Sequence, residues 1–282
     1  MPDWGDVAEG QRYQSIGQDL ATTSGIQVNA GNSVKPATYT QLAAAGVLNF
    51  DASGIYINIV NSSPGRWLID IAVGTAGSEV IIVPDIAYET PRTNERANQL
   101  FFPINIAAGT RISARARAAS ASTAVYLSVT LVGGSLMQSF NTVLAYGITI
   151  GSTYGTSVDP GAVANTKGAV TALLLRDAAG ALIGTGSVLR PINQFLVVVT
   201  TLGRGTSNAN AGYLIDLALG GSNLILTDIP FRTGNTPDFP AQCFFGPYPL
   251  QIPVGVELGA RCQSSNATLS TRPIGISLYG VS

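Results

Sequence analysis

Two aspartates, Asp70 and Asp216, are the residues of this chain that come closest to a catalytic arrangement. Each lies inside an otherwise apolar run, LIDIAVG at residues 68–74 and LIDLALG at residues 214–220. A pair of carboxylates facing each other across a cleft can serve as general acid and as base or nucleophile, as in glycoside hydrolysis. Carboxylate-only hydrolysis is therefore the enzymatic chemistry that the residue types of this sequence leave open.

Other catalytic chemistries lack their residues. The sequence has no histidine among its 282 residues, which removes the commonest general base and metal ligand and any Ser-His-Asp or Cys-His arrangement. A zinc ion would find two cysteines and scattered carboxylates. The chain has neither a GxxxxGK[ST] phosphate loop nor a closely spaced acidic loop for calcium. We therefore expect no bound metal and no cofactor.

The second half of the sequence repeats the first. The two LID-containing runs are 146 positions apart, and so are PINI at residues 103–106 and PLQI at residues 249–252. A period this long exceeds the roughly 20 to 50 residues of repeat arrays and matches the size of an ordinary domain. The pattern predicts a tandem duplication of one domain.

The duplication favours a structural role for the two aspartates. Both copies keep one Asp and one Arg at the same spacing, Asp70 with Arg115 and Asp216 with Arg261. We expect each carboxylate to bond backbone amides of an adjacent loop or to pair with the arginine of its own copy. Catalysis at these positions is the less favoured interpretation, and the chain is predicted not to be an enzyme.

The apolar residues occur in short runs separated by Gly, Pro, Ser, Asn and Thr, as in GIYINIV at residues 54–60. This pattern indicates strands rather than helices. About eight such strands per copy predict an all-β fold of two tandem antiparallel β-sandwiches, each jelly-roll-like. The predicted organisation is an N-terminal extended arm at residues 1–25, a first sandwich at 26–134, a packed linker at 135–160 and a second sandwich at 161–282.

The arm stands outside the duplication and lacks strand alternation. Trp4, Arg12 and Tyr13 are its candidate partner contacts, set among several acidic residues. The segment is interpreted either as a solvated, disordered arm or as one that docks on a neighbouring subunit, because large aromatics supply binding area at small entropic cost. The linker is too apolar for a free tether, so we expect it to pack and hold the two domains in a fixed relation.

The composition is typical of a subunit packed against other proteins. The sequence is 46% hydrophobic but only 11% charged, whereas a free monomer usually carries more surface charge. It has no basic footprint for nucleic acid. Arg111, Arg115 and Arg117 are interpreted as a solvated or partner-facing ladder on one strand. We expect a homo-oligomer, with a trimer favoured.

No segment approaches the ~20 consecutive apolar residues that span a bilayer, and the first residues do not resemble a signal peptide. We therefore expect synthesis in the cytoplasm and no membrane contact. Under those conditions Cys243 and Cys262 are predicted to be buried thiols, and a disulfide between them is the alternative.

Both copies, from about residue 26 to the end, resemble structural proteins of tailed-bacteriophage virions, which are β-sandwich modules often found in tandem. The segments that carry the resemblance are WLIDIAVGTAGSE at 67–79, FFPINIAAGTRI at 101–112, ANTKGA at 164–169 and YLIDLALG at 213–220. The resemblance implies a non-enzymatic subunit that is made in the bacterial cytoplasm and located in the virion. It implies the major capsid protein or other virion subunits as partners.

Within that setting the favoured role is head decoration, in which the protein cements the capsid surface. A neck, collar, tail or fibre-base component is the alternative. A third, different interpretation is a host-surface glycan-binding module whose loops present aromatic side chains to sugar.

Overall fold

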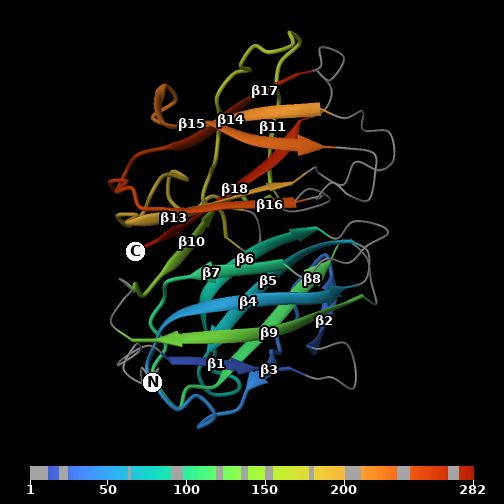
Figure 1. The fold of residues 1–282 in the computed structure, drawn as a ribbon, viewed down its shortest axis with the longest axis vertical. Coiled ribbons are helices and arrows are strands. Elements are labelled where there is room, and N and C mark those ends of the chain that lie inside the picture. The colour runs from blue at the N-terminus through green and yellow to red at the C-terminus, as the bar shows by residue number, and fades with distance from the viewer. Residues whose placement is uncertain are drawn as a thin grey trace, which may run out of the picture.

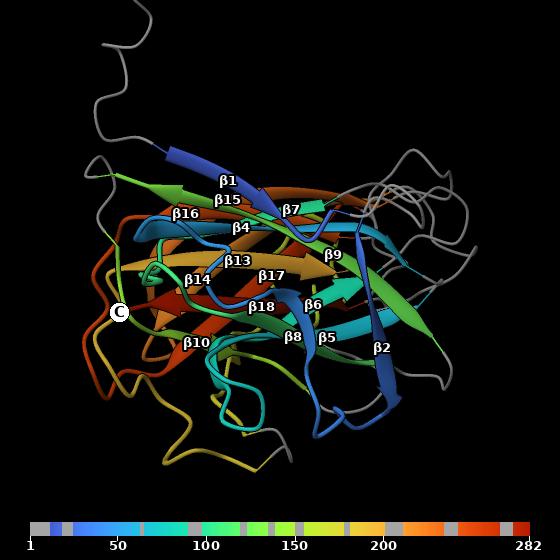
Figure 2. The same ribbon diagram turned by 90° about the horizontal axis from the view of Figure 1, so that it is seen from below.

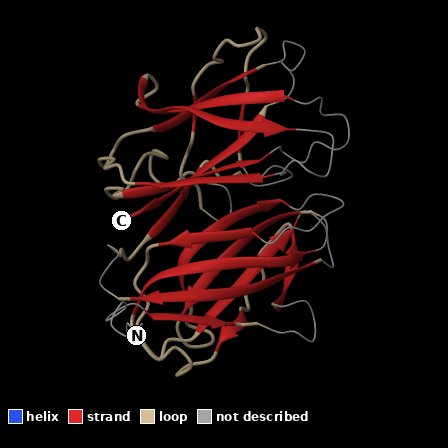
Figure 3. Ribbon diagram, in the orientation of Figure 1, coloured by secondary structure: helices blue, strands red, loops and turns tan. Residues whose placement is uncertain are grey.

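The computed structural model describes residues 12–18, 25–62, 65–89, 98–118, 123–134, 139–149, 155–177, 181–200, 211–233, 242–265 and 273–282. Within these residues every regular element is a strand (Figure 3). No helix long and apolar enough to cross a membrane occurs in this described part of the chain. The protein is all-β, with two antiparallel β-sandwiches in tandem (Figure 1).

The strands of the first sandwich are β1 (Arg12–Ile16), β2 (Ile26–Asn32), β3 (Thr40–Ala43), β4 (Ala52–Ser62), β5 (Arg66–Val73), β6 (Val80–Glu89), β7 (Asn98–Phe102), β8 (Ile112–Ala118) and β9 (Ala124–Gly133). Sheet I has the order β2-β9-β4-β7, and sheet II has the order β3-β8-β5-β6. Strand β2 joins them, because its first half pairs with β9 and its last three residues pair with β8. This two-sheet connectivity is that of a jelly roll.

The strands of the second sandwich are β10 (Val143–Tyr146), β11 (Thr156–Val158), β12 (Thr171–Ala172), β13 (Gln194–Thr200), β14 (Ala211–Leu219), β15 (Asn223–Thr233), β16 (Gln242–Tyr248), β17 (Leu258–Ser264) and β18 (Ile274–Val281). Sheet III contains β11-β18-β13-β16 with β10 also on β18, and sheet IV has the order β12-β17-β14-β15. Every strand from β10 to β18 takes the place of the strand nine numbers lower, so the duplication predicted from sequence extends to the topology.

Strand alternation builds each core. In β4 the side chains of Ile55, Ile57 and Ile59 point inward and are fully buried, whereas Tyr56 and Asn58 between them lie on the outer face. The two-residue period of an extended strand separates the faces in this way. The sequence pattern predicted a strand for this segment.

The predicted N-terminal arm contains a strand of the first sandwich. β1 pairs antiparallel with β9, from Arg12 opposite Gly133 to Ile16 opposite Val129. Main-chain hydrogen bonds hold β1 in the sheet, and Ile16 is the side chain that β1 contributes to the core. A strand held mainly by backbone hydrogen bonds needs no alternation of apolar and polar residues. Because residues 12–16 lack that alternation, the sequence predicted them to be part of an arm. Residues 1–11 and 19–24 of the arm lie outside the described residues.

The predicted linker also belongs partly to a sandwich. β10 and β11 pair with β18, so the second sandwich begins before residue 161. Phe140, Val143, Ala145 and Ile148 are buried in the core of the first sandwich. These apolar side chains made the segment unsuitable as a free tether, and they pack across the boundary between the two domains.

Sheet III is buried on both of its faces. Phe195, Val197 and Val199 of β13 face the core of the second sandwich, whereas Leu196 and Val198 belong to the core of the first. The sheet lies in the middle of the molecule (Figure 1), and along the long axis the two sandwiches overlie each other (Figure 2). Burial on both faces explains why β13 is a continuous apolar run rather than an alternating one.

Side chains of sheet III also satisfy the edge of sheet II. The Tyr279 hydroxyl accepts the Ala87 N–H and donates to the Asp85 carbonyl, both at 2.7 Å. The Gln242 amide oxygen accepts the Glu89 N–H at 2.7 Å, and its nitrogen donates to the Ala87 carbonyl. An edge strand normally leaves its outward N–H and C=O groups exposed, and another strand can pair with them. Here β6 is closed by two side chains of the second sandwich.

The Tyr279 hydroxyl is predicted to stabilise the joined sandwiches. Tyr279→Phe leaves the buried Ala87 N–H and Asp85 carbonyl without a partner, which costs about 1–3 kcal/mol of unfolding free energy. Urea unfolding followed by tyrosine fluorescence measures the loss. Tyr126→Phe, which removes a hydroxyl bonded to Gln27 on the outer face of sheet I, is the matched control and should change stability by less than about 0.5 kcal/mol. Equal effects of the two changes would contradict the edge-closing role.

Candidate functional site

A buried ion cluster surrounds the first repeated aspartate. One oxygen of Asp70, Oδ2, accepts Arg115 Nε at 2.9 Å. The other, Oδ1, accepts the backbone N–H of Asp85 at 2.9 Å and an ammonium hydrogen of Lys35. Lys35 also contacts the Asp85 carboxylate. The carboxylate of Asp70, which is 1% exposed, therefore has both oxygens engaged.

The second copy reproduces this cluster atom for atom. Asp216 Oδ2 accepts Arg261 Nε at 2.8 Å, and Oδ1 accepts Lys167 Nζ at 2.6 Å. The Asp228 N–H donates to Asp216 Oδ1 at 3.0 Å, and Lys167 reaches the Asp228 carboxylate at 2.9 Å. The structure thus brings together each Asp with the Arg of its own copy and with a backbone amide, both of which the sequence interpretation named.

A β-bulge in each copy aims the backbone amide at the carboxylate. Ile69 and Ile71 of β5 lie opposite Ile86 and Val83 of β6, so β6 holds one more residue than β5 at this point. The extra stretch contains Asp85, whose φ of 50° is left-handed. Asparagine and aspartate tolerate this conformation better than most residues. Asp228, with a φ of 57°, occupies the corresponding bulge of β15.

The electrostatics favour a permanently charged carboxylate. Burial by itself raises the pKa of Asp216, but hydrogen bonds from Lys167, from the Asp228 N–H and from Arg261 outweigh it, and the pKa lies below its usual range. A general acid needs the opposite, a pKa raised toward neutrality. Asp216 is 2% exposed and is held by two cations, so its geometry suits a structural ion cluster.

Sequence reasoning missed half of the cluster. Lys35 and Lys167 are the only two lysines of the chain, one in each copy, and that distribution could have identified them. Asp85 and Asp228 are harder to find, because the turn before their strand is longer in the first copy (residues 74–79) than in the second (residues 220–222), so their spacing from the first aspartate differs between the copies.

The arginine ladder of β8 is neither solvated nor partner-facing, which corrects the sequence interpretation. Arg111 binds the Glu79 carboxylate at 3.0 Å. Arg117 is buried and donates to the Ser33 carbonyl at 3.4 Å. Arg115 lies 4.7 Å from the ring centroid of Tyr39 and donates to the Pro36 carbonyl at 3.4 Å. The loop at 33–39 crosses the outer face of sheet II, where Arg115 and Arg117 hold it.

The candidate partner contacts lie on or before β1. Arg12 and Tyr13 are exposed on this strand, and the Tyr13 side chain is 62% exposed. Trp4 lies outside the described residues. The structure therefore places Arg12 and Tyr13 at a sheet edge and leaves their contact with a partner a prediction.

The two cysteines are free thiols. Cys262 is buried in the second core, and Cys243 is half-buried on β16. Burial raises the pKa of both, that of Cys262 to about 12. A thiol with such a pKa is almost entirely protonated at neutral pH and therefore a poor nucleophile.

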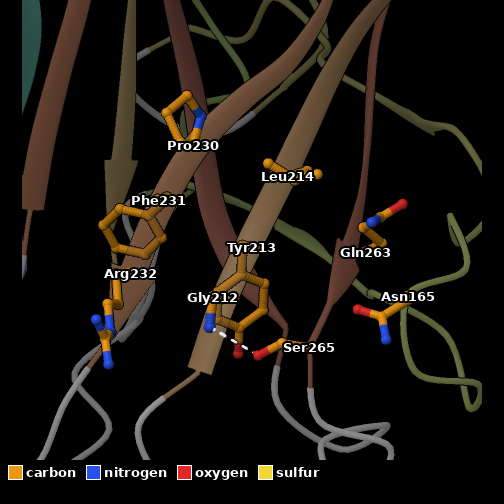
Figure 4. A pocket seen from close by; sticks show the side chains of 9 residues that line it. All are labelled: Asn165, Gly212, Tyr213, Leu214, Pro230, Phe231, Arg232, Gln263 and Ser265. Carbon is orange, nitrogen blue, oxygen red and sulfur yellow. Dashed lines mark hydrogen bonds between the residues drawn. The ribbon is translucent and has the colours of Figure 1, made fainter.

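A hollow of about 420 Å³ lies on the outer face of sheet IV (Figure 4). Its floor is Leu214, paired with Pro230 on one side and Gln263 on the other. Beside it Gly212 lies opposite Arg232. Small-molecule sites typically measure about 300–1,000 Å³. The hollow is therefore large enough for a ligand, and sequence reasoning did not anticipate it.

The first copy fills the same place. Arg66 and Glu89 pair across β5 and β6 at 3.3 Å, where the second copy has Gly212 and Arg232. Arg117 stands where the second copy has Gln263. Pro230 replaces Ala87 at a fourth position, so the side chains at this place differ between the copies on a shared backbone.

Comparisons with known proteins add little to this geometry. No protein-family model matches the sequence, and no curated protein matches it significantly. Among solved structures, N-glycanase F (PNGase F) is 11% identical with a TM-score of 0.35, over 96% of each chain. The tandem CBM22-1-CBM22-2 domain of Paenibacillus barcinonensis Xyn10C is 9% identical with a TM-score of 0.24, over 97% of this chain and 92% of that one. Similarities this low say nothing about function.

The ion cluster generates a prediction about stability and pH. Asp216→Asn removes the negative charge between Lys167 and Arg261, and we expect a loss of about 3 kcal/mol in unfolding free energy at pH 7. Because the folded pKa of Asp216 lies below the unfolded value of about 3.9, its contribution is complete above about pH 5 and disappears as the pH falls through the folded pKa. The difference between wild type and variant should therefore shrink toward pH 2 in urea titrations.

Glu257→Gln is the control for this prediction, since it removes an exposed carboxylate just before β17. Its unfolding free energy should stay within about 0.5 kcal/mol of wild type at every pH. A variant Asp216→Asn as stable as wild type at pH 7, or one whose deficit grows in acid, would contradict the structural role of the cluster.

Proposed function

We propose that this chain is a non-enzymatic structural subunit of a bacteriophage particle, and that its role is decoration of the head. The observation that carries the non-enzymatic part is the burial of Asp70 and Asp216. The carboxylates that offered hydrolytic chemistry are held by Lys35, Lys167 and two arginines, away from any substrate. The resemblance of both copies to tailed-phage virion proteins supports the setting.

The architecture suits a cementing role. Two jelly rolls share a buried interface and so form one stiff body rather than two tethered modules. A stiff body loses little conformational entropy when it binds, and many modest contacts on a lattice give strong attachment through effective concentration. The major capsid protein is the proposed partner. The neck, collar, tail or fibre base is the alternative location.

The copy number in purified particles tests this proposal. Head decoration predicts a ratio to the major capsid protein near one or a simple fraction, measured by quantitative mass spectrometry. A ratio of a few per cent would move the subunit to the neck or tail, because those structures contain far fewer subunits than the head. Absence from the particles would overturn the virion assignment altogether.

The hollow on sheet IV favours a second candidate function, binding of an acidic glycan. Leu214 and Pro230 offer an apolar floor for the C–H face of a sugar ring. The amides of Asn165 and Gln263 at the side suit hydroxyl groups. Arg232 contributes a cation to the lining, which favours a sugar that carries a carboxylate.

Trigalacturonate is the probe for this candidate, and neutral trigalactose is its control. Calorimetry on the full chain should detect binding of the acidic trisaccharide alone. Gly212→Arg introduces the residue of the first copy with its Cβ in ordinary contact with Ser265 Oγ at 3.7 Å, and it should abolish binding. Arg232→Gln should weaken binding at least about tenfold. Arg190→Gln, an exposed arginine elsewhere, should leave it unchanged. Equal binding of both trisaccharides, or binding by Gly212→Arg, would reject the site.

A further inference from the structure

The contact between the two sandwiches of one chain joins two different surfaces. One is the open end of the first sandwich at β6 and β7, and the other is the outer face of sheet III. Because the fold is duplicated, each chain carries both surfaces a second time, namely the β15 and β16 end of the second sandwich and the outer face of sheet I. We infer that these two remaining surfaces bind each other between copies of the chain, head to tail.

The end of the second sandwich lacks the cover that the first one has. Phe102 and Val83 are fully buried at the end of the first sandwich. By strand register their counterparts are Phe245 and Leu226, and both are only partly buried. Burying equivalent apolar area in one copy and exposing it in the other indicates a missing neighbour.

A third position shows the same difference. Ile104 is fully buried, and its segment bonds Phe140 of the linker that enters the second sandwich. Leu250 occupies the matching place in the PLQI segment and is 37% exposed.

The outer face of sheet I keeps the groups that make the contact on sheet III. Gln242 and Phe244 of β16 face the first sandwich. Gln99 and Phe101 of β7 take their places by register. In the single chain Gln99 donates to Asn58 Oδ1 at 2.7 Å, an exposed bond that an incoming main chain can replace. The outer face of sheet I therefore retains an aromatic side chain, Phe101, for packing and a side-chain amide, Gln99, that can bond the main chain of an edge strand.

One pair of positions changes in a complementary way. In the contact within the chain, the Tyr279 hydroxyl accepts the Ala87 N–H. The counterparts are Val132 on sheet I and Pro230 on β15. Proline has no N–H, and the valine side chain, which is already buried within the single chain, has no acceptor, so donor and acceptor are absent together. The Pro230 carbonyl takes the place of the Ala87 carbonyl that accepts the amide nitrogen of Gln242.

Because the two surfaces differ, the contact is heterologous, and it generates a closed ring or an open filament. A ring leaves no uncovered end and matches the trimer favoured from sequence. The inference depends on the duplicated interface and not on a place in a phage particle. It therefore stands or falls independently of the proposed function.

The molecular mass of the full chain tests the contact. Sedimentation from about 1 to 100 µM, the range in which contacts of moderate strength dissociate, should show dimers or larger species. Phe101→Glu on sheet I and Leu250→Glu at the other end should each reduce the mass to that of one chain. An equimolar mixture of these two variants should form a dimer, because each keeps one intact surface.

Val163→Glu, at an exposed loop position on neither surface, is the control and should sediment as wild type. Gln99→Lys, which alters an exposed side chain, should repeat the effect of Phe101→Glu and so guards against loss through misfolding. A wild-type chain that stays monomeric at every concentration would overturn the inference. So would a mixture of the two variants that remains monomeric.

Discussion

The structure depends on the burial of sheet III between two hydrophobic cores. Its inner face completes the second sandwich, and its outer face, with Leu196 and Val198, closes the end of the first. Tyr279 and Gln242 add bonds to the main chain of β6, which would otherwise be an exposed strand edge. One sheet thus supplies apolar burial and edge protection together. The two domains are for that reason one folding and mechanical unit.

The ion clusters lie on the outer faces of sheets II and IV. Each ties the loop that carries its lysine, and the bulge that carries its second aspartate, to the outer face of a sheet. Burying the carboxylate of Asp70 or Asp216 is costly, and the cost is offset only when both of its oxygens find donors. Asp70 and Asp216 meet that condition through Arg115 and Arg261 and through backbone amides. Such complete pairing explains why the whole set is duplicated rather than a single ion pair.

The differences between the copies are as informative as their likeness. On the same backbone the first copy places Arg66 against Glu89, and the second leaves Gly212 beside Arg232 and so opens a hollow. The first copy covers Phe102, and the second leaves Phe245 half-buried. Each copy therefore serves as a control for the other, because a feature present in one alone is not needed for the fold.

Much of the fold is determined locally and could be derived from the sequence. Short apolar runs separated by turn residues indicated an all-β sandwich, and the offset of 146 positions indicated the duplication. The pairing of Asp70 with Arg115 could also be inferred, since repetition in both copies points to a shared contact. The pairing of β1 with β9 could not, because a strand held by its backbone leaves no side-chain signal.

Only the tertiary structure decided that sheet III is buried on both faces, that the end of the second sandwich stays open and where the hollow lies. Tyr279 and Ala87 are 192 positions apart in sequence, yet they share a hydrogen bond. Lys35 reaches Asp85 across a bulge whose extra residue shifts the register. A sequence pattern reports the period of a single strand. Contacts between distant strands depend on register, twist and the packing of whole sheets, and these follow only from the assembled fold.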